Sequence, residues 1–92
     1  MPLFFFDTRD NDAFIEDDEG LDFPDLEAVR VQATRALADL ARDVIHTCLK
    51  RELAIEVRDE GGPVLKTILI FEAIILRPEW PNRVSLGSST LN

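Results

Sequence analysis

The side chains that could do chemistry in this sequence are concentrated in one acidic segment. Asp7 to Glu27 holds ten of the chain's 18 acidic residues and a single basic residue, Arg9. Hard cations such as Ca²⁺ are bound by closely spaced carboxylate and carbonyl oxygens. The weak candidates for such ligands are Asp10, Asp12, Asp17, Asp18 and Glu19.

The spacing of these carboxylates does not match a calcium-binding loop. Counting from Asp7 places Arg9 where an EF-hand needs an oxygen ligand, and no glycine stands at the sixth position. We therefore assign no metal site and interpret the segment as a solvated acidic loop. Two alternatives stay open: a divalent-cation-binding domain that uses Asp7 to Glu19, and an acidic docking surface for a basic partner.

Catalytic and cofactor-binding patterns are not found. The only histidine, His46, has no candidate nucleophile or orienting residue around it. Cys48 is the single cysteine, so it cannot form an internal disulfide and is interpreted as a small core residue. Glycine-rich phosphate loops, Cys/His ligand clusters and nucleophile elbows are missing. We expect no catalytic residues, no cofactor and no enzymatic activity; an enzyme with an unrecognised site is kept as a further alternative.

The composition disfavours nucleic acid and membrane as partners. The formal net charge is −8, and phosphate backbones are bound by lysines and arginines that release counterions. The apolar run from Ile68 to Leu76 contains Glu72 and is far shorter than the ~20 residues of a membrane span. The apolar run Leu3 to Phe6 is too short for a signal-peptide core. A cytoplasmic location is expected.

One long helix is the best-marked element. Apolar residues recur at three- and four-residue spacing from Leu26 to Cys48. Asp25 is the predicted N-cap and Glu27 suits the positive end of the helix dipole. The helix is predicted to run from Asp25 to Leu49, with Lys50 and Arg51 closing it. Its length of about 37 Å exceeds the dimensions expected for so small a domain, which predicts an overhang, fraying or a partner subunit.

The remaining elements are predicted strands. The aromatic run Leu3 to Phe6 is the first and is expected to end at Asp7, with Ala13 to Glu16 as its hairpin partner. Leu53 to Arg58 alternates in polarity, and Asp59 to Pro63 forms the turn into a further strand, Val64 to Ile70. A short helical or irregular segment is expected near Glu72 to Leu76, and an intersubunit strand is the alternative.

These elements predict an α+β fold: strand, strand, helix, strand, strand, with an antiparallel sheet and one long helix packed on one face. Residues 1–76 form a single domain and residues 77–92 a C-terminal tail. Surplus apolar surface predicts a homodimer, formed by the uncovered sheet face, the sheet edge or the C-terminal segment. An unidentified protein partner is also considered. The predicted interaction residues are Phe5, Ile68, Ile70, Ile74 and Trp80.

Several short motifs resemble those of a family of small uncharacterised bacterial domains. They are the aromatic strand Phe4-Phe5-Phe6-Asp7, the turn Asp17-Asp18-Glu19-Gly20, the helix start Pro24-Asp25-Leu26-Glu27-Ala28 and the strand end Asp59-Glu60-Gly61. The resemblance covers about residues 3 to 72 and implies the order of elements and a bacterial origin, but no activity and no catalytic residue. The order of elements is also loosely similar to HicB-type antitoxins. The functional expectation is a non-catalytic protein-interaction or regulatory module.

Overall fold

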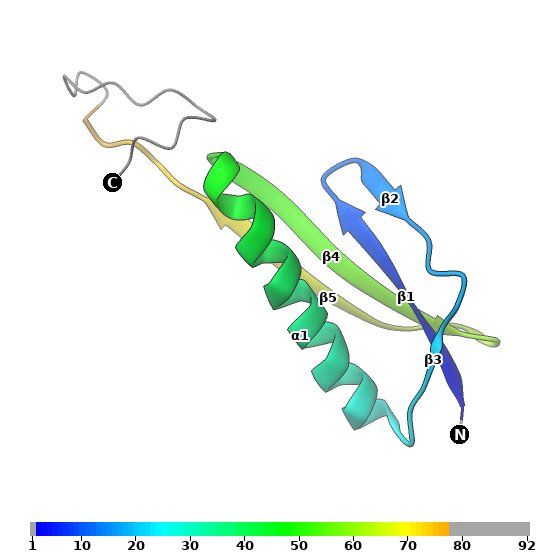
Figure 1. The fold of residues 1–92 in the computed structure, drawn as a ribbon. Helices are drawn as coiled ribbons and strands as arrows, with labels where there is room; N and C mark the ends of the chain where they lie inside the picture. Colours follow the sequence, from blue (N-terminus) through cyan, green and yellow to red (C-terminus); the bar gives the residue numbers. More distant parts are fainter. Residues whose placement is uncertain (1, 78–92) are drawn as a thin grey trace.

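The architecture is an antiparallel sheet with a long helix on one face. The computed structural model describes residues 2–77. Its elements in chain order are β1 (Leu3–Asp10), β2 (Ala13–Ile15), β3 (Leu21–Asp22), α1 (Leu26–Val44), the 3-10 turn η1 (Ile45–Thr47), β4 (Lys50–Asp59) and β5 (Gly62–Glu72). The sheet order is β2-β1-β4-β5, and β3 also pairs with β1. Figure 1 shows α1 running along β4 and β5. The predicted α+β class is confirmed.

The start of α1 is the predicted one because Asp25 is its N-cap. Asp25 Oδ1 accepts a hydrogen bond of 2.8 Å from the backbone N–H of Ala28. This bond satisfies one of the N–H groups that have no partner within the first helical turn. Glu27 lies in that turn, where the helix dipole favours a negative charge.

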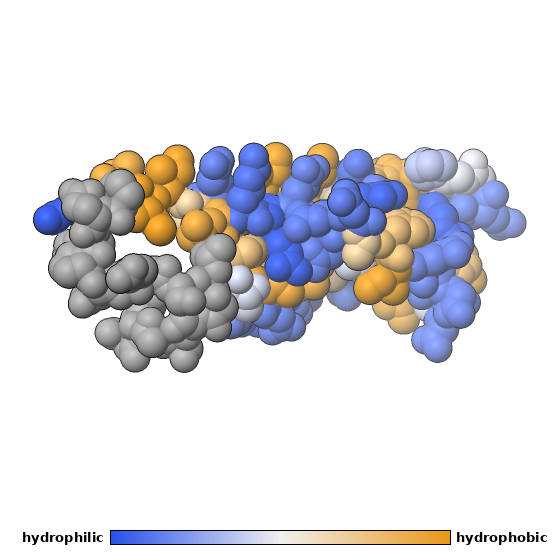
Figure 2. Space-filling view, turned by 90° about the horizontal axis from the view of Figure 1, so that it is seen from above, coloured by the Kyte–Doolittle hydropathy of each residue, from blue (hydrophilic) through white to orange (hydrophobic). Residues whose placement is uncertain are grey.

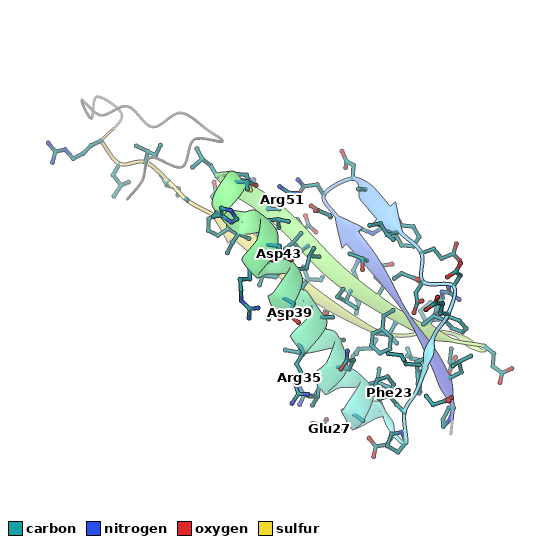
Figure 3. The ribbon with its side chains drawn as sticks, in the orientation of Figure 1. Phe23, Glu27, Arg35, Asp39, Asp43 and Arg51 are labelled. Carbon is teal, nitrogen blue, oxygen red and sulfur yellow. The ribbon has the colours of Figure 1, made fainter. Side chains whose placement is uncertain are left out.

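The two sides of α1 differ sharply in polarity. The buried side consists of Val29, Ala33, Leu37 and Ala41. These residues follow one another at four-residue spacing, so they form one stripe against the sheet. The labelled side chains of Glu27, Arg35, Asp39 and Asp43 are all exposed and lie along the helix in Figure 3.

The end of α1 differs from the prediction. The helix ends at Val44 and is followed by η1, not by a helix to Leu49. Lys50 and Arg51 do not close the helix, because both belong to β4. The guanidinium of Arg51 binds Asp10 of β1 with nitrogen–oxygen distances of 2.7 and 2.9 Å. This cross-strand ion pair competes with helix continuation and favours the strand.

The first strand is longer than the predicted Leu3 to Phe6. β1 continues to Asp10, and the hairpin turn consists of Asn11 and Asp12. Asn11 has φ 53°, a left-handed conformation that asparagine tolerates better than most residues. The prediction that Asp7 ends this strand is therefore wrong.

Charged residues can extend β1 because β4 supplies partners for them. Asp7 pairs with Arg58 at 2.9 Å, and Arg9 pairs with Glu56 at 3.0 Å. A charge in a strand is tolerated when an opposite charge on the neighbouring strand compensates it. The apolar pattern alone predicts that the strand ends at Asp7, because it contains no information about these ion pairs.

The two C-terminal strands form the longest hairpin and are longer than predicted. The turn between them is Glu60-Gly61, shorter than the predicted Asp59 to Pro63. Gly62 adopts φ 119°, which only glycine adopts readily. Residues 73–76 form neither helix nor strand, so the irregular alternative of the prediction is the one observed.

The core lies between α1 and one face of the sheet. Its buried members are Phe4, Val29, Ala33, Leu37, Ala41, Leu53, Ile55 and Val57, and Phe6, Phe23, Leu65 and Leu69 pack around them. The described molecule is elongated, with extents of 57 × 22 × 18 Å and a radius of gyration of 16.9 Å, against about 12 Å for a globular domain of this length. Because α1 packs on one face only, the other face of this long sheet is not covered by a helix of the described chain.

Candidate protein-interaction surface

The acidic segment is built into the sheet through Asp17. The outer edge of β1 pairs with β3 at Leu3 and Phe4 and with β2 from Thr8 onward. Between these two short strands the Asp17 carboxylate takes over: its Oδ2 accepts from the Phe6 N–H at 3.0 Å. The side chain thus replaces a missing strand.

The same carboxylate also forms a turn. Asp17 Oδ1 accepts from the backbone N–H groups of Glu19 at 3.0 Å and Gly20 at 3.3 Å. The pKa of Asp17 is lowered, with the Phe6 N–H bond as the largest cause. Gly20 has φ 78°, and a Cβ there would meet the Phe5 ring at 3.0 Å. Conformation and space both call for glycine.

Asp7, which is buried, and Arg58, which is partly exposed, form a polar cluster beside this turn. Asp7 is 5% exposed, and its carboxylate accepts from Arg58 and from the Asp17 N–H. Arg58 also donates to the Asp17 carbonyl at 2.9 Å and pairs with Glu16 at 3.3 Å. The hydrogen bond with Asp7 is the main cause of the raised pKa of Arg58. The Asp7 carboxylate and the Asp17 carbonyl oxygen both accept hydrogen bonds from donors of the same chain.

The candidate cation ligands are not gathered into one site. Asp10 is paired with Arg51, which lowers the pKa of its carboxyl group. Asp12 lies in the β1–β2 turn, while Asp18 and Glu19 are exposed beside the Asp17 turn. Within residues 2–77 no group of three or more histidine, cysteine or acidic side chains has the arrangement of a metal site.

His46 and Cys48 lie at the far end of α1 from the Asp17 turn. His46 is exposed in η1, and Cys48 is partly buried just after it. The thiol lies 3.8 Å from the Val44 carbonyl oxygen and 3.8 Å from Arg51 Nη1. These contacts anchor the start of β4.

The predicted interaction residues fall in different places. Phe5 is half-buried, because the Arg58 guanidinium covers its ring at 4.6 Å from the centroid. Ile68 and Ile70 lie two residues apart on β5, are 53% and 67% exposed, and face away from α1. Ile74 follows β5 and is also exposed. Trp80 lies outside the described residues.

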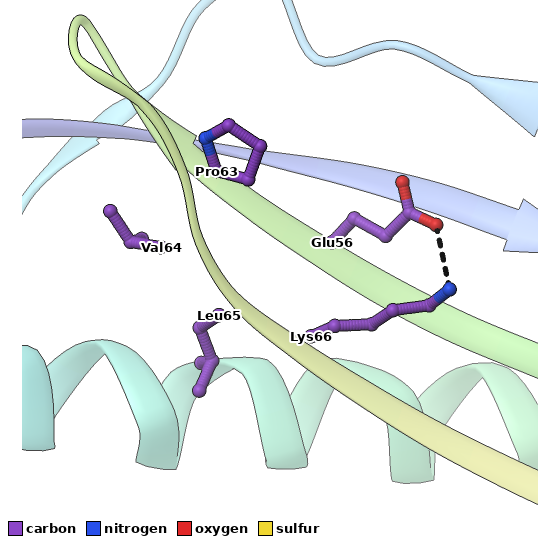
Figure 4. Close-up of a pocket in the computed structure, with 5 residues that line it drawn as sticks. All are labelled: Glu56, Pro63, Val64, Leu65 and Lys66. Carbon is purple, nitrogen blue, oxygen red and sulfur yellow. Dashed lines mark ion pairs between the residues drawn. The ribbon is translucent and has the colours of Figure 1, made fainter.

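The face of the sheet opposite α1, which we call the open face, carries the apolar side chains of Ile68 and Ile70 on β5 with a charged residue on each side of them, Lys66 and Glu72. Glu56 binds both Arg9 and Lys66, at 3.0 and 3.4 Å. Figure 4 shows the Glu56–Lys66 ion pair, with Leu65 pointing from β5 toward α1. The pKa of Glu56 is lowered, chiefly by the hydrogen bond from Arg9.

Apolar atoms also gather where the described chain ends. Ile74, Ile75 and Leu76 are 71%, 49% and 85% exposed. In Figure 2 apolar atoms cluster at the left end of the molecule, whereas apolar and charged atoms are interspersed along its remaining length. The exposed apolar surface thus begins on β5 and continues past it.

β5 is an edge strand of the described sheet. It pairs with β4 along one edge only. Exposed edges present rows of unpaired backbone N–H and C=O groups, and these are a ready template for another strand. β5 therefore combines backbone groups that no described strand pairs with and two exposed apolar side chains, Ile68 and Ile70, as a protein-binding edge does.

The chain matches one known protein family. A family model described as a domain of unknown function (DUF6894) matches residues 3–71. The chain belongs to this family. No curated protein and no solved structure matches it.

The DUF6894 match follows the elements of the structure closely. It begins at the first residue of β1 and ends one residue before the end of β5. Asp7, Asp17, Arg58 and β5 as far as Phe71 therefore lie within the DUF6894 region. No helix of the described chain is long and apolar enough to cross a membrane.

The Asp7–Asp17–Arg58 cluster was missed by the analysis of the sequence. The order Asp17-x-Glu-Gly did indicate a turn, but nothing in it indicates which strand receives the carboxylate. The register between β1 and β4 decides which strand receives the carboxylate, because it places Phe5 opposite Arg58.

Proposed function

We propose that this DUF6894 domain is a non-catalytic protein-interaction module that binds through β5. The single observation that carries the proposal is the coincidence, on one strand, of an edge that no described strand pairs with and two exposed isoleucines, Ile68 and Ile70. Strand addition uses backbone hydrogen bonds for affinity and alternate side-chain positions for specificity. β5 supplies both.

The polar clusters support a structural role for the charged residues. Asp7, Asp10 and Glu56 each bind an arginine of the same chain. Side chains that are tied to one another in this way stabilise the sheet and are not free to bind a substrate or a cation. A regulatory role is proposed by analogy with HicB-type antitoxins, to whose order of elements the sequence has a loose resemblance.

The proposal is tested by photo-crosslinking in the cells that produce the protein. A photoreactive phenylalanine analogue replaces Ile70 in one variant and Arg35, on the exposed side of α1 (Figure 3), in a control variant. We expect a protein adduct from position 70 and none from position 35. An absence of adducts at position 70, or the same adducts from both positions, would contradict the proposal.

A further inference from the structure

The backbone groups that β5 offers can be assigned residue by residue. In an antiparallel pair, opposed residues alternate between those that exchange hydrogen bonds and those that do not. The N–H of Ala73 donates to the Leu49 carbonyl at 2.7 Å, in register with the β4–β5 ladder. Counting back from Ala73, the odd-numbered residues bond to β4. The even-numbered residues from Lys66 to Glu72 therefore direct their backbone groups to the open edge.

The same even-numbered residues project their side chains onto the open face. Lys66, Ile68, Ile70 and Glu72 are all exposed, whereas the alternate residues are half-buried. Read along the strand they are basic, apolar, apolar and acidic. This order is self-complementary, because reversing it places each charge opposite its counterion and each isoleucine opposite an isoleucine.

We propose that β5 pairs with β5 of a second copy of this chain, antiparallel about a two-fold axis at Leu69; this inference rests on the proposed function and names its partner. A two-fold axis at Leu69 places Lys66 opposite Glu72 of the partner subunit, and Ile68 opposite Ile70 of the partner subunit. Such an interface is isologous, so each contact occurs twice.

Other registers lose this complementarity. Centring the axis on Ile68 places Lys66 opposite an isoleucine, and centring it on Ile70 places Ile68 opposite Glu72. Centring it on Lys66 brings two lysines together. A shift by a single residue along one strand would exchange the two faces of the sheet. The Leu69 register is the one that pairs both charges of β5.

The charges of β4 continue the pattern across the interface. Glu56 is the β4 neighbour of Lys66, and Lys50 is the β4 neighbour of Glu72. In the dimer these residues form a row of alternating charge that runs from Glu56 through Lys66 to Glu72 and Lys50 of the partner subunit. Opposite charges on adjacent strands stabilise pairing and disfavour wrong registers.

The location of the acidic segment also favours this edge over the other. Ten of the 18 acids lie from Asp7 to Glu27, the part of the chain that forms β1, β2, β3, their connections and the start of α1. Two copies brought together at the β2 edge would repel each other. β5 carries one lysine and one glutamate, so it has no such penalty.

The apolar residues after β5 find a place in the same arrangement. Beyond Glu72, residues 73–76 of each copy run beside the first residues of the other copy's β5. Ile74 and Leu76, which are 71% and 85% exposed in the single chain, are thereby brought next to protein. Burial of apolar area is the main favourable term in association.

The register is tested with two charge-reversed full-length chains, Lys66→Glu and Glu72→Lys. Each variant alone brings two like-charged pairs together and should dimerise at least roughly tenfold more weakly than the wild type. Mixed in equal amounts, the two variants restore both opposite-charge pairs. Sedimentation velocity should therefore show a dimer in the mixture and monomer in each separate sample, at a concentration where the wild type is dimeric.

Arg35→Glu is the matched control, because it also reverses one exposed charge but lies on α1; it should sediment as the wild type does. Circular dichroism of every variant establishes that it is folded. A monomeric wild type would overturn self-pairing, and a wild-type dimer without recovery in the mixture would overturn the register. Photo-crosslinks from position 70 to a different protein would overturn the second copy as partner while leaving the proposed function intact.

Discussion

At the scale of single residues, Asp17 is the side chain of the acidic segment that binds the most backbone groups. One carboxylate accepts three backbone N–H groups, those of Phe6, Glu19 and Gly20. It therefore completes the edge of β1 and shapes the turn before β3. A carboxylate in an acid-rich loop is usually only solvated, so this one is distinguished by its position and not by its type.

Replacing Asp17 by alanine tests this role. We expect a loss of about 1–3 kcal/mol in the free energy of unfolding, since backbone donors near the sheet edge lose their acceptor. Asp18→Ala removes the neighbouring exposed carboxylate and should cost less than about 0.5 kcal/mol. Urea denaturation of both variants measures the difference. Equal stability of the two variants would show that the Asp17 bonds contribute nothing.

At the scale of elements, features set by neighbours in the sequence are predictable, whereas features set by contacts between distant strands are not. The N-cap Asp25 and the apolar stripe of α1 depend on neighbours in sequence, and both are predicted correctly. The extension of β1 through Asp10 depends on Arg51, 41 residues away along the chain. An apolar pattern has no access to that contact.

The predicted helix end shows the same limit. The apolar spacing continues to Cys48, so local periodicity extends the helix beyond Val44. The chain instead leaves the helix because β4 gains a partner on each side, β1 and β5. Of the candidate site residues, Ile68 and Ile70 were found from surplus hydrophobicity. The importance of Lys66 and Glu72 needed the register of β5.

At the scale of the whole molecule, paired carboxylates make stability depend on pH. The pKa values of Asp10, Asp17 and Glu56 are all lowered in the folded state, chiefly by hydrogen bonds from Arg51, Phe6 and Arg9 respectively. The unfolded chain binds protons to these groups more readily than the folded chain does. Their contribution is therefore fully present above the ordinary pKa values, near 4, and is lost as pH falls through the lower folded values.

We expect the urea midpoint to change little between pH 7 and about pH 5 and to fall below about pH 4. Asp17→Ala lacks one of the carboxyl groups whose pKa is lowered in the folded state, so its midpoint should fall less steeply over the same range. Denaturation curves at several pH values measure both slopes. A midpoint that rises on acidification, or parallel curves for the two proteins, would contradict the assignment.

Self-pairing through β5 would turn an elongated chain with an open edge into a closed assembly. The sheet would continue across both copies, and the apolar positions of β5 would have partners. The remaining edge consists of two short strands, β2 and β3, with the acidic residues 16–19 between them, and short, charged edges disfavour further addition. Self-pairing through β5 therefore predicts a dimer and not a fibre.

The most direct test is amide hydrogen exchange along β5, measured by nuclear magnetic resonance on the full chain at high and low concentration. Pairing of β5 with a second β5 predicts that the N–H groups of Lys66, Ile68, Ile70 and Glu72 are protected at high concentration and exchange quickly on dilution, while those of Thr67 and Leu69, bonded to β4, stay protected throughout. Rapid exchange of the four even-numbered amides at every concentration would contradict it.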